Sequence, residues 1–240
     1  MLDRIRIVLI NTSHPGNIGS AARAMKTMGL HELYLVNPKE FPHQKADEMS
    51  SGADDILKRA VVVDTLEQAV ADCTLVIGTS ARERTIPWPL YAPRQIADKL
   101  KLEAAESRTA IVFGREQSGL TNEELSCCNW HMQIPANPDF SSLNLASAVQ
   151  VVAYELRVAS LDNPQMAEAW DNRLATADEM EYLFKHFEEV MVKINFLDPA
   201  APRKLMPRLR RFFFRARPDV METNIFRGLL TAIEDKISVK

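Results

Sequence analysis

The chain has 240 residues, 46% of them hydrophobic and 25% charged, which is ordinary for a globular protein with one full domain and a smaller one. Its net charge of −3 argues mildly against a nucleic-acid partner. No apolar run reaches the roughly 20 residues of a membrane span, and three cysteines give neither a disulfide framework nor a zinc-site spacing. The amino terminus lacks a signal-peptide layout, so we expect a cytoplasmic protein with reduced thiols and no metal.

The first two thirds of the chain alternate between two kinds of segment. Short apolar, β-branched runs occur at residues 5–10, 33–36, 61–63, 75–77, 110–113 and 132–134. Apolar residues with helical spacing lie between them at residues 21–28, 66–71 and 93–100. Strands that are apolar on both faces and separated by helices predict an α/β domain over residues 1–160, with a parallel sheet and helices on both faces. Such a domain binds ligands at the carboxyl ends of its strands.

A break at residues 161–165 precedes a part of the chain without a strand pattern. Helical spacing at residues 177–194, 205–215 and 224–237 predicts a small helical extension over residues 161–240. Acidic residues dominate its first part, and seven lysines and arginines crowd residues 203–217. Because a local basic patch attracts polyanions whatever the net charge, this cluster is a candidate RNA surface.

The first strand-to-helix junction, residues 11–23, carries glycines and opens a helix. Gly16 and Gly19 give the spacing G-x-x-G, which lacks the G-x-G-x-x-G pattern of dinucleotide-binding oxidoreductases and argues against that class. Arg23 lies roughly opposite the apolar stripe of this helix, so it is either a surface arginine or an anion-binding residue. His14 is either incidental or a proton-transfer group.

Three further features complete a set of loops at predicted strand ends. In residues 112–120, Arg115 and Glu116 follow a strand and are candidates for substrate contact. Residues 78–84 combine small residues with two arginines, and residues 134–144 form a loop that two prolines stiffen. Small-residue loops with arginines at one edge of a sheet together point to a ligand site.

The stiff third loop leads into an apolar helix, which we expect to run over residues 143–156. Ser141 or Ser142 can cap this helix, because a serine oxygen accepts hydrogen bonds from the first free N–H groups. Asn144 needs a polar partner, since an unpaired buried amide is costly. A rigid loop that ends on helix N–H groups suits a small polar ligand.

These segments resemble the three signature motifs of the SPOUT-class RNA methyltransferases. The matching stretches are Asn17 to Arg23, residues 113–120 and residues 134–144, and the likeness covers nearly the whole chain. More narrowly, the sequence is similar to the TrmH-type branch, which methylates ribose 2′-hydroxyls. It is similar above all to bacterial enzymes that act on cytidine or uridine at nucleotide thirty-two of the tRNA anticodon loop.

The resemblance implies a fold and partners that composition and spacing do not reveal. It implies a trefoil knot in the carboxyl-terminal part of the α/β domain, S-adenosyl-L-methionine bound in that knot, a homodimer, and tRNA as the substrate. Two alternatives to methylation of nucleotide thirty-two stay open. One is a 2′-O-methyltransferase that acts on another tRNA or rRNA nucleotide, and the other is a non-catalytic RNA-binding protein with a decayed pocket.

The motifs and the basic cluster also imply residue roles. The expected catalytic residues are Arg23, Ser142 and Asn17. The expected cofactor-binding residues are Thr79, Ser80, Ala81, Gly114, Glu116, Gly119, Ile134, Ser141, Ser142 and Leu143. The expected RNA-binding residues are His14, Arg82, Arg84, Arg115, Arg208, Arg210, Arg211, Arg215 and Arg217. Asn144 is expected either to brace the third loop or to have only a structural role.

Three consecutive phenylalanines, residues 212–214, interleave with the arginines of the basic cluster. Three in a row cannot all stack on bases, so we expect them in the core of the extension. The arginines are then expected to contact phosphates. The alternative is a helix whose phenylalanines are buried and whose arginines are only solvated.

Overall fold

A computed structural model describes residues 1–80, 90–103, 107–161 and 172–238. Within these ranges seven strands form one sheet, all pairings parallel, in the order β3-β2-β1-β6-β4-β7-β5. The strands are β1 (Ile5–Ile10), β2 (Glu32–Val36), β3 (Val61–Val63), β4 (Leu75–Thr79), β5 (Leu90–Tyr91), β6 (Thr109–Phe113) and β7 (Trp130–Met132). The predicted α/β class is confirmed. The last predicted strand lies two residues earlier than expected, and the two-residue strand β5 is not apparent from the sequence.

The two central strands explain why the sequence is apolar on both faces of the sheet. β1 and β6 are buried along their whole length. Along β1, Ile5, Ile7 and Leu9 face one hydrophobic core, whereas Val8 and Ile10 face the other. Burial on both sides is typical of parallel strands between two helical layers.

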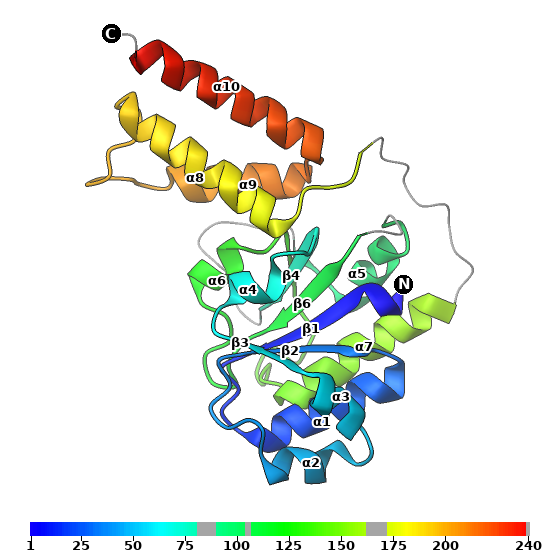
Figure 1. Cartoon of the computed structure of the whole chain (residues 1–240). Coiled ribbons are helices and arrows are strands. Elements are labelled where there is room, and N and C mark those ends of the chain that lie inside the picture. The colour runs from blue at the N-terminus through cyan, green and yellow to red at the C-terminus, as the bar shows by residue number, and fades with distance from the viewer. Residues whose placement is uncertain (81–89, 104–106, 162–171, 239–240) are drawn as a thin grey trace.

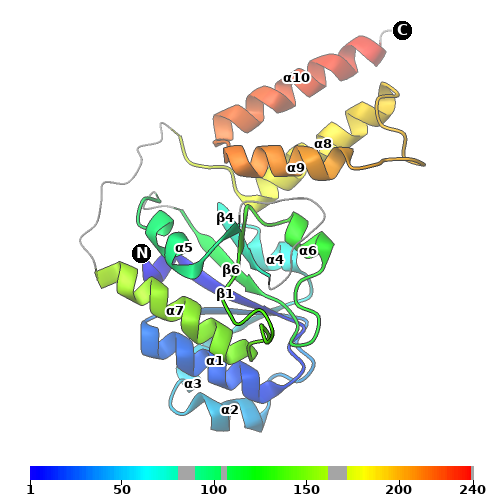
Figure 2. The same cartoon turned by 180° about the vertical axis from the view of Figure 1, so that it is seen from behind.

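Helices cover both faces of the sheet, as Figure 1 and the reverse view in Figure 2 show. One face packs against α1 (Pro15–Met28), α2 (Gln44–Ser50), α3 (Asp54–Arg59), α5 (Pro93–Leu100) and α7 (Leu145–Leu161). The opposite face packs against α4 (Leu66–Val70) and α6 (Asn122–Ser126). A short 3-10 turn, Leu2–Arg4, leads into β1.

Helix α1 begins earlier than its apolar pattern indicates, at Pro15 in place of residue 21. The fixed φ of proline suits a first helical turn, and His14 caps the helix by accepting a 3.2 Å hydrogen bond at Nδ1 from the Gly16 N–H. Gly19 permits a close approach of α2, since an added Cβ would lie 2.0 Å from the carbonyl oxygen of Ala46. The amino-terminal half of α1 is therefore tightly fixed.

Helix α7 begins at Leu145, and Asn144 caps it. The Asn144 side-chain oxygen accepts hydrogen bonds from the N–H groups of Ala146 (2.9 Å) and Ser147 (3.4 Å). The expectation that Ser141 or Ser142 caps this helix is wrong, because both serines lie in the loop before Asn144. Their place in the loop puts them beside the ligand site described below.

Over residues 172–238 the second part of the chain contains three helices, α8 (Ala177–Lys193), α9 (Leu205–Ala216) and α10 (Val220–Ser238), with bounds close to those predicted. They share a hydrophobic core of their own. Phe184 lies edge to face with Phe213 and Phe214, with ring centroids 6.0 and 5.4 Å apart. Phe213 and Phe214 are buried, but Phe212 is 52% exposed. The expectation of three core phenylalanines is therefore wrong for Phe212.

The helical extension lies on the α4 and α6 side of the sheet (Figure 1). The N–H of Ala177 donates a 2.8 Å hydrogen bond to the carbonyl oxygen of Cys73, just before β4. The Arg217 guanidinium pairs with the Glu103 carboxylate, with 2.7 Å between Nη2 and Oε2, and lies over the ring of Trp130 at the start of β7. The extension therefore contacts the amino ends of β4 and β7.

Candidate active site

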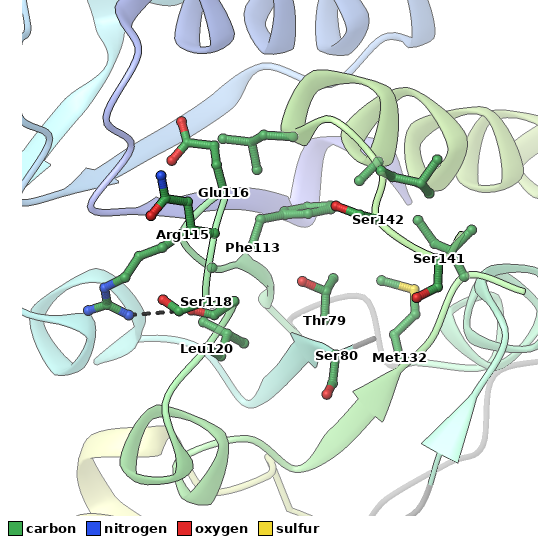
Figure 3. Close-up of a pocket in the computed structure, with 17 residues that line it drawn as sticks. Thr79, Ser80, Phe113, Arg115, Glu116, Ser118, Leu120, Met132, Ser141 and Ser142 are labelled. Carbon is green, nitrogen blue, oxygen red and sulfur yellow. Dashed lines mark hydrogen bonds between the residues drawn. The ribbon is translucent and has the colours of Figure 1, made fainter. Parts of the chain in front are cut away.

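A cavity of about 230 Å³ lies at the carboxyl ends of β4, β6 and β7 (Figure 3). This is the edge where a parallel sheet binds its ligands. The cavity is lined by nine of the ten expected cofactor-binding residues, namely Thr79, Ser80, Gly114, Glu116, Gly119, Ile134, Ser141, Ser142 and Leu143. The tenth, Ala81, lies outside the described residues. Three loops that are far apart in the sequence thus meet around one space.

Apolar side chains that sequence reasoning does not single out form much of the cavity wall. They are Phe113, Leu120, Met132 and Leu145. Each lies at or beside a predicted loop, but an apolar residue that lines a cavity cannot be distinguished in the sequence from one that lies in a core. Figure 3 shows Phe113, Thr79, Met132 and the two loop serines around the same space. Apolar walls with a few hydroxyl and backbone polar groups suit a nucleoside, whose base has apolar faces and whose sugar is polar.

Two glycines shape the loop after β6. Arg115 and Gly119 exchange backbone hydrogen bonds of 3.2 and 2.9 Å, which close a tight turn. Gly119 has φ of +68°, in the left-handed region that favours glycine, and a Cβ on Gly114 would lie 2.2 Å from the carbonyl carbon of Gly119. Both glycines are therefore required by the turn itself.

Arg115 braces this edge of the sheet. Its guanidinium forms two 3.0 Å hydrogen bonds with the Glu124 carboxylate and one of 2.6 Å with the side-chain oxygen of Asn11. Figure 3 shows the guanidinium directed away from the cavity. Arg115 thus has internal partners, and a phosphate would have to displace a carboxylate that holds it bidentately. The expected RNA contact of Arg115 stays a prediction.

Glu116 joins the loop after β6 to the junction before α1. Its carboxylate accepts hydrogen bonds from the N–H and hydroxyl of Ser13, at 3.2 and 3.1 Å, and from the side-chain amide of Asn17 at 3.0 Å. Burial raises the pKa of Glu116, but the hydrogen bonds from Asn17 and Ser13 outweigh burial and hold the pKa below its usual value. Glu116 is therefore ionised at neutral pH and fixes the position of Asn17.

Asn144 extends this connection to the third loop. Its side-chain amide donates a 3.0 Å hydrogen bond to the side-chain oxygen of Asn17. The Asn144 oxygen caps α7 and the Glu116 carboxylate can only accept, so the orientation of both asparagine amides is determined. The structure thus joins the junction before α1, the loop after β6 and the loop before α7 through Asn17, Glu116 and Asn144, and it gives Asn144 a bracing role as well as a capping role.

The three expected catalytic residues occupy different places. Ser142 lines the cavity, and Asn17 touches the cavity-lining Glu116. Arg23 does not line the cavity; it is exposed on α1, as its position opposite the apolar stripe predicts. Within the described part of the chain no hydrogen bond or ion pair occupies the Arg23 guanidinium. That side chain is available to an anion from outside the protein.

The expected RNA-binding arginines of α9 separate into two groups. Arg208 and Arg215 are exposed, and Arg211 is half-buried. Arg210 forms two 2.7 Å hydrogen bonds with Glu181, and its guanidinium lies over the ring of Phe184. Arg210 and Arg217 are thus engaged in ion pairs inside the protein, and their expected contacts with RNA stay predictions.

Two other expectations concern the remaining RNA-binding candidates. His14 is exposed, but its Nδ1 is used as the cap of α1. Arg82 and Arg84 lie outside the described residues.

Among the described residues, the possible metal ligands do not gather in one place, and the cysteine thiols have raised pKa values. In the ranges that the structure covers, no group of three or more His, Cys, Asp or Glu side chains could hold a metal ion. Burial raises the pKa of Cys73 to about 12 and that of Cys127 to about 11, and it places the pKa of Cys128 well above its usual value. These thiols are therefore protonated at neutral pH. Among the same residues, none of the helices is both long and apolar enough to span a membrane.

Known proteins resemble this chain over nearly its whole length. The SpoU rRNA Methylase family matches residues 4–154, and the C-terminal domain of the tRNA methyltransferase TrmJ matches residues 178–240. A tRNA (cytidine/uridine-2′-O-)-methyltransferase TrmJ of Yersinia pestis (strain Pestoides F) is 52% identical over 238 residues, which cover 98% of this chain and 93% of the relative. A tRNA (cytidine/uridine/adenosine-2′-O-)-methyltransferase TrmJ of Pseudomonas aeruginosa (strain UCBPP-PA14) is 54% identical over 241 residues, covering 96% and 94%.

A solved structure extends the likeness to three dimensions. The crystal structure of TrmJ from Z. mobilis ZM4 superposes with a TM-score of 0.84 at 33% identity, and the match covers 95% of this chain and 98% of that one. The resemblance of the sequence motifs is thereby confirmed over both parts of the chain. The chain belongs to the SpoU methylase family and, within it, to the TrmJ methyltransferases.

Proposed function

We propose that this protein transfers a methyl group from S-adenosyl-L-methionine to the ribose 2′-hydroxyl of nucleotide thirty-two in the anticodon loop of tRNA. The observation that carries the proposal is the cavity where the loops after β4, β6 and β7 meet, together with the hydrogen bonds of Asn17, Glu116 and Asn144 that join two of these loops to the junction before α1. Relatives that match almost the whole chain are named tRNA 2′-O-methyltransferases, which supports tRNA as the substrate and the ribose 2′-oxygen as the acceptor.

The cofactor is proposed to bind among the loops after β4, β6 and β7. The apolar residues Phe113, Leu120 and Met132 suit its adenine, and the hydroxyls of Ser141 and Ser142 suit its polar groups. When bound, S-adenosylmethionine supplies a methyl group on a positively charged sulfur. The chain's own residues must then align the acceptor oxygen with this methyl group and exclude competing water. Alignment of two reacting groups lowers the barrier because they no longer have to find each other in solution.

Arg23 is proposed to hold a phosphate next to the target ribose. Removing a proton from a guanidinium at neutral pH costs roughly 9 kcal/mol, so a role as general base is difficult to defend. A charged guanidinium can grip a phosphate through two parallel hydrogen bonds, which fixes the neighbouring 2′-oxygen. The 2′-proton can then pass to that phosphate or to water once methyl transfer has advanced.

The protein is proposed to act as a homodimer through α7. Val151, Tyr154 and Leu161 on this helix are 37%, 51% and 70% exposed, and apolar surface of this kind marks an interface. Helix α1, which carries Arg23, packs against α7. Arg23 can therefore serve its own site or that of the partner subunit.

The knot, the domain boundary and the site of action are also proposals. β6 lies between β1 and β4, and β7 lies between β4 and β5, so later strands enter between earlier ones, which supports threading of the carboxyl-terminal part of the domain.

We assign residues 1–160 to the methyltransferase domain and residues 161–240 to a tRNA-binding extension. The two family matches, which end at residue 154 and begin at residue 178, support this division. The proposed site of action is the cytoplasm, because the proposed substrate, tRNA, is found there.

Incubation with labelled S-adenosylmethionine and unmodified tRNA, followed by mapping of the modified nucleotide, tests the proposal. We expect label at nucleotide thirty-two when that nucleotide is cytidine or uridine. Adenosine at this position is a third substrate to test, because one relative carries it in its name. Absence of label on every RNA would contradict the activity, and label at a different nucleotide would contradict only the position.

A further inference from the structure

Helix α9 has two faces of opposite character. At about 100° per residue, Lys204, Arg208, Phe212 and Arg215 fall within about 80° of one another around the helix axis. All four are exposed. We call these four residues the α9 face. No acidic residue occurs between residues 199 and 218, so the sequence of α9 places nothing on this face to neutralise it.

The opposite side of α9 is the side that anchors the helix. Phe213 and Phe214 are 3% and 4% exposed in the core of the extension, and Arg210 is held by Glu181. Arg217, just after the helix, is held by Glu103. Position thus separates two pairs of arginines in the basic cluster: Arg210 and Arg217 complete internal ion pairs, whereas Arg208 and Arg215 on the α9 face are exposed.

Phe212 is the residue on this face that core packing does not explain. It is 52% exposed although its two neighbours in sequence are buried. Its ring meets the ring of Phe213 edge to face, with centroids 5.4 Å apart and planes at 88°, and this contact restrains its orientation. A restrained, half-exposed ring between cationic side chains is the arrangement with which proteins bind unpaired nucleotides, since bases stack on the ring and phosphates meet the cations.

We infer that the α9 face binds a single-stranded segment of RNA, with Phe212 stacked on an unpaired base and Arg208 and Arg215 on the flanking phosphates. Charge complementarity favours a polyanion over an apolar partner, because three of the four residues on the face are cationic. The exposed ring favours unpaired nucleotides over a duplex, whose bases are already stacked. The inference rests on the proposed function in that the RNA is tRNA.

Substitutions of Phe212 test the stacking. Phe212→Ala is expected to weaken binding of tRNA by roughly 5- to 150-fold, the fold-change that corresponds to the loss of one stacked base. The slope of log affinity against log salt concentration should stay the same, because no charge is removed. Phe212→Trp should retain the affinity, and the added indole emission should change when tRNA is bound.

The matched control is Tyr182→Ala. Tyr182 is an aromatic residue on the neighbouring helix α8 with a similar exposure of 58%, but it lies one turn from Asp178 and Glu179. Its removal is expected to leave tRNA affinity unchanged. Equal losses in Phe212→Ala and Tyr182→Ala would overturn the assignment of stacking to Phe212.

The charged residues are tested separately. Arg208→Gln and Arg215→Gln should each weaken binding and flatten the salt dependence by about 0.7 in the logarithmic slope, as expected for one phosphate contact to a single strand. The parent protein should also prefer a single-stranded oligonucleotide to a duplex of the same length, and Phe212→Ala should lose that preference.

The outcomes separate this inference from the proposed function. If the parent protein methylates tRNA but Phe212→Ala binds tRNA as tightly as the parent, the inference is wrong and the function stands. If the parent binds RNA through Phe212 but transfers no methyl group, the proposed function fails instead. A change in sedimentation of Phe212→Ala with unchanged RNA affinity would identify the α9 face as a contact between copies of the chain, which also overturns the inference.

Discussion

The side-chain amide of Asn144 donates a hydrogen bond of 3.0 Å to the side-chain oxygen of Asn17, although 127 positions separate the two residues. The amide of Asn17 in turn donates to the Glu116 carboxylate over 3.0 Å. Asn144 also caps α7 through its oxygen. One short chain of side chains therefore fixes the start of α7, the junction before α1 and the loop after β6 around the cavity.

Asn144→Asp separates the two roles of Asn144. Aspartate caps a helix as well as asparagine does, so the free energy of unfolding should change little. Aspartate has no amide to donate to Asn17, so the link between the loops is lost. We expect kcat/KM for methyl transfer to fall roughly 10- to 150-fold, as for the loss of a hydrogen bond in a charged network.

Asn144→Ala is the companion variant, because it removes the cap as well. Its unfolding free energy should fall by about 1 kcal/mol more than that of Asn144→Asp, with a similar loss of activity. Denaturant titration and steady-state kinetics on both variants provide the measurement. Full activity in Asn144→Asp would show that the bridge to Asn17 does not support catalysis.

Glu116 predicts a pH dependence of stability. Its pKa in the folded protein lies below the ordinary value of 4.5, so the ionised carboxylate stabilises the fold fully above that value. This stabilisation must be lost as pH falls from about 4.5 through the lower pKa of the folded state. Glu116→Gln lacks the titrating group, so its stability deficit relative to the parent should be constant near neutral pH and shrink in acid. A deficit that does not change with pH, measured by urea denaturation, would contradict the pKa shift.

Arg217 predicts a large effect on stability. Arg217 and Glu103 are only 12% and 10% exposed, so Arg217→Met leaves a buried carboxylate without its partner. We expect a loss of about 3–5 kcal/mol in the free energy of unfolding. The matched control is Arg215→Ala on the exposed side of α9, two residues before Arg217, which should change stability by less than about 0.5 kcal/mol. Equal stabilities of the two variants would mean that the ion pair does not anchor the extension.

Arg23→Lys tests the proposed phosphate contact. Lysine keeps the charge but cannot form two parallel hydrogen bonds, so tRNA binding should persist in part while kcat falls roughly 10- to 150-fold. Arg59→Lys is the control, because Arg59 is an exposed arginine paired with Asp55 on α3. Unchanged turnover in Arg23→Lys would remove Arg23 from the mechanism.

Local patterns predict the elements of the fold well, for physical reasons. The central strands are buried on both faces, so they appear as unbroken apolar runs, and helices α8 to α10 keep regular apolar spacing. The order of the strands is a different matter. Periodicity carries no information about which strand lies beside which, so the insertion of β6 between β1 and β4 is not apparent from the sequence.

In the candidate site, too, local patterns predict some features and the arrangement of the chain in space determines the others. The loops could be predicted, because glycines and prolines mark them, but their connection through Asn17, Glu116 and Asn144 depends on the topology. Charge was the least reliable guide, since a sequence shows an arginine but not its partner: Arg115 and Arg210 both bind glutamates of the same chain.

Phe212 is the one of the three consecutive phenylalanines that does not lie in the core of the extension. Consecutive residues of a helix point about 100° apart, so helical geometry alone requires that three phenylalanines in a row cannot all face one core.

The central claim is transfer of a methyl group to one ribose oxygen, and a tRNA with a single 2′-deoxyribose at nucleotide thirty-two tests it most directly. Such a tRNA keeps its fold and its phosphates but lacks the proposed acceptor. Incubated with the protein and labelled S-adenosylmethionine, it should take up no label, whereas a tRNA with the same change at a neighbouring nucleotide should be labelled like the unmodified one. Undiminished labelling of the tRNA that lacks this hydroxyl would contradict the account.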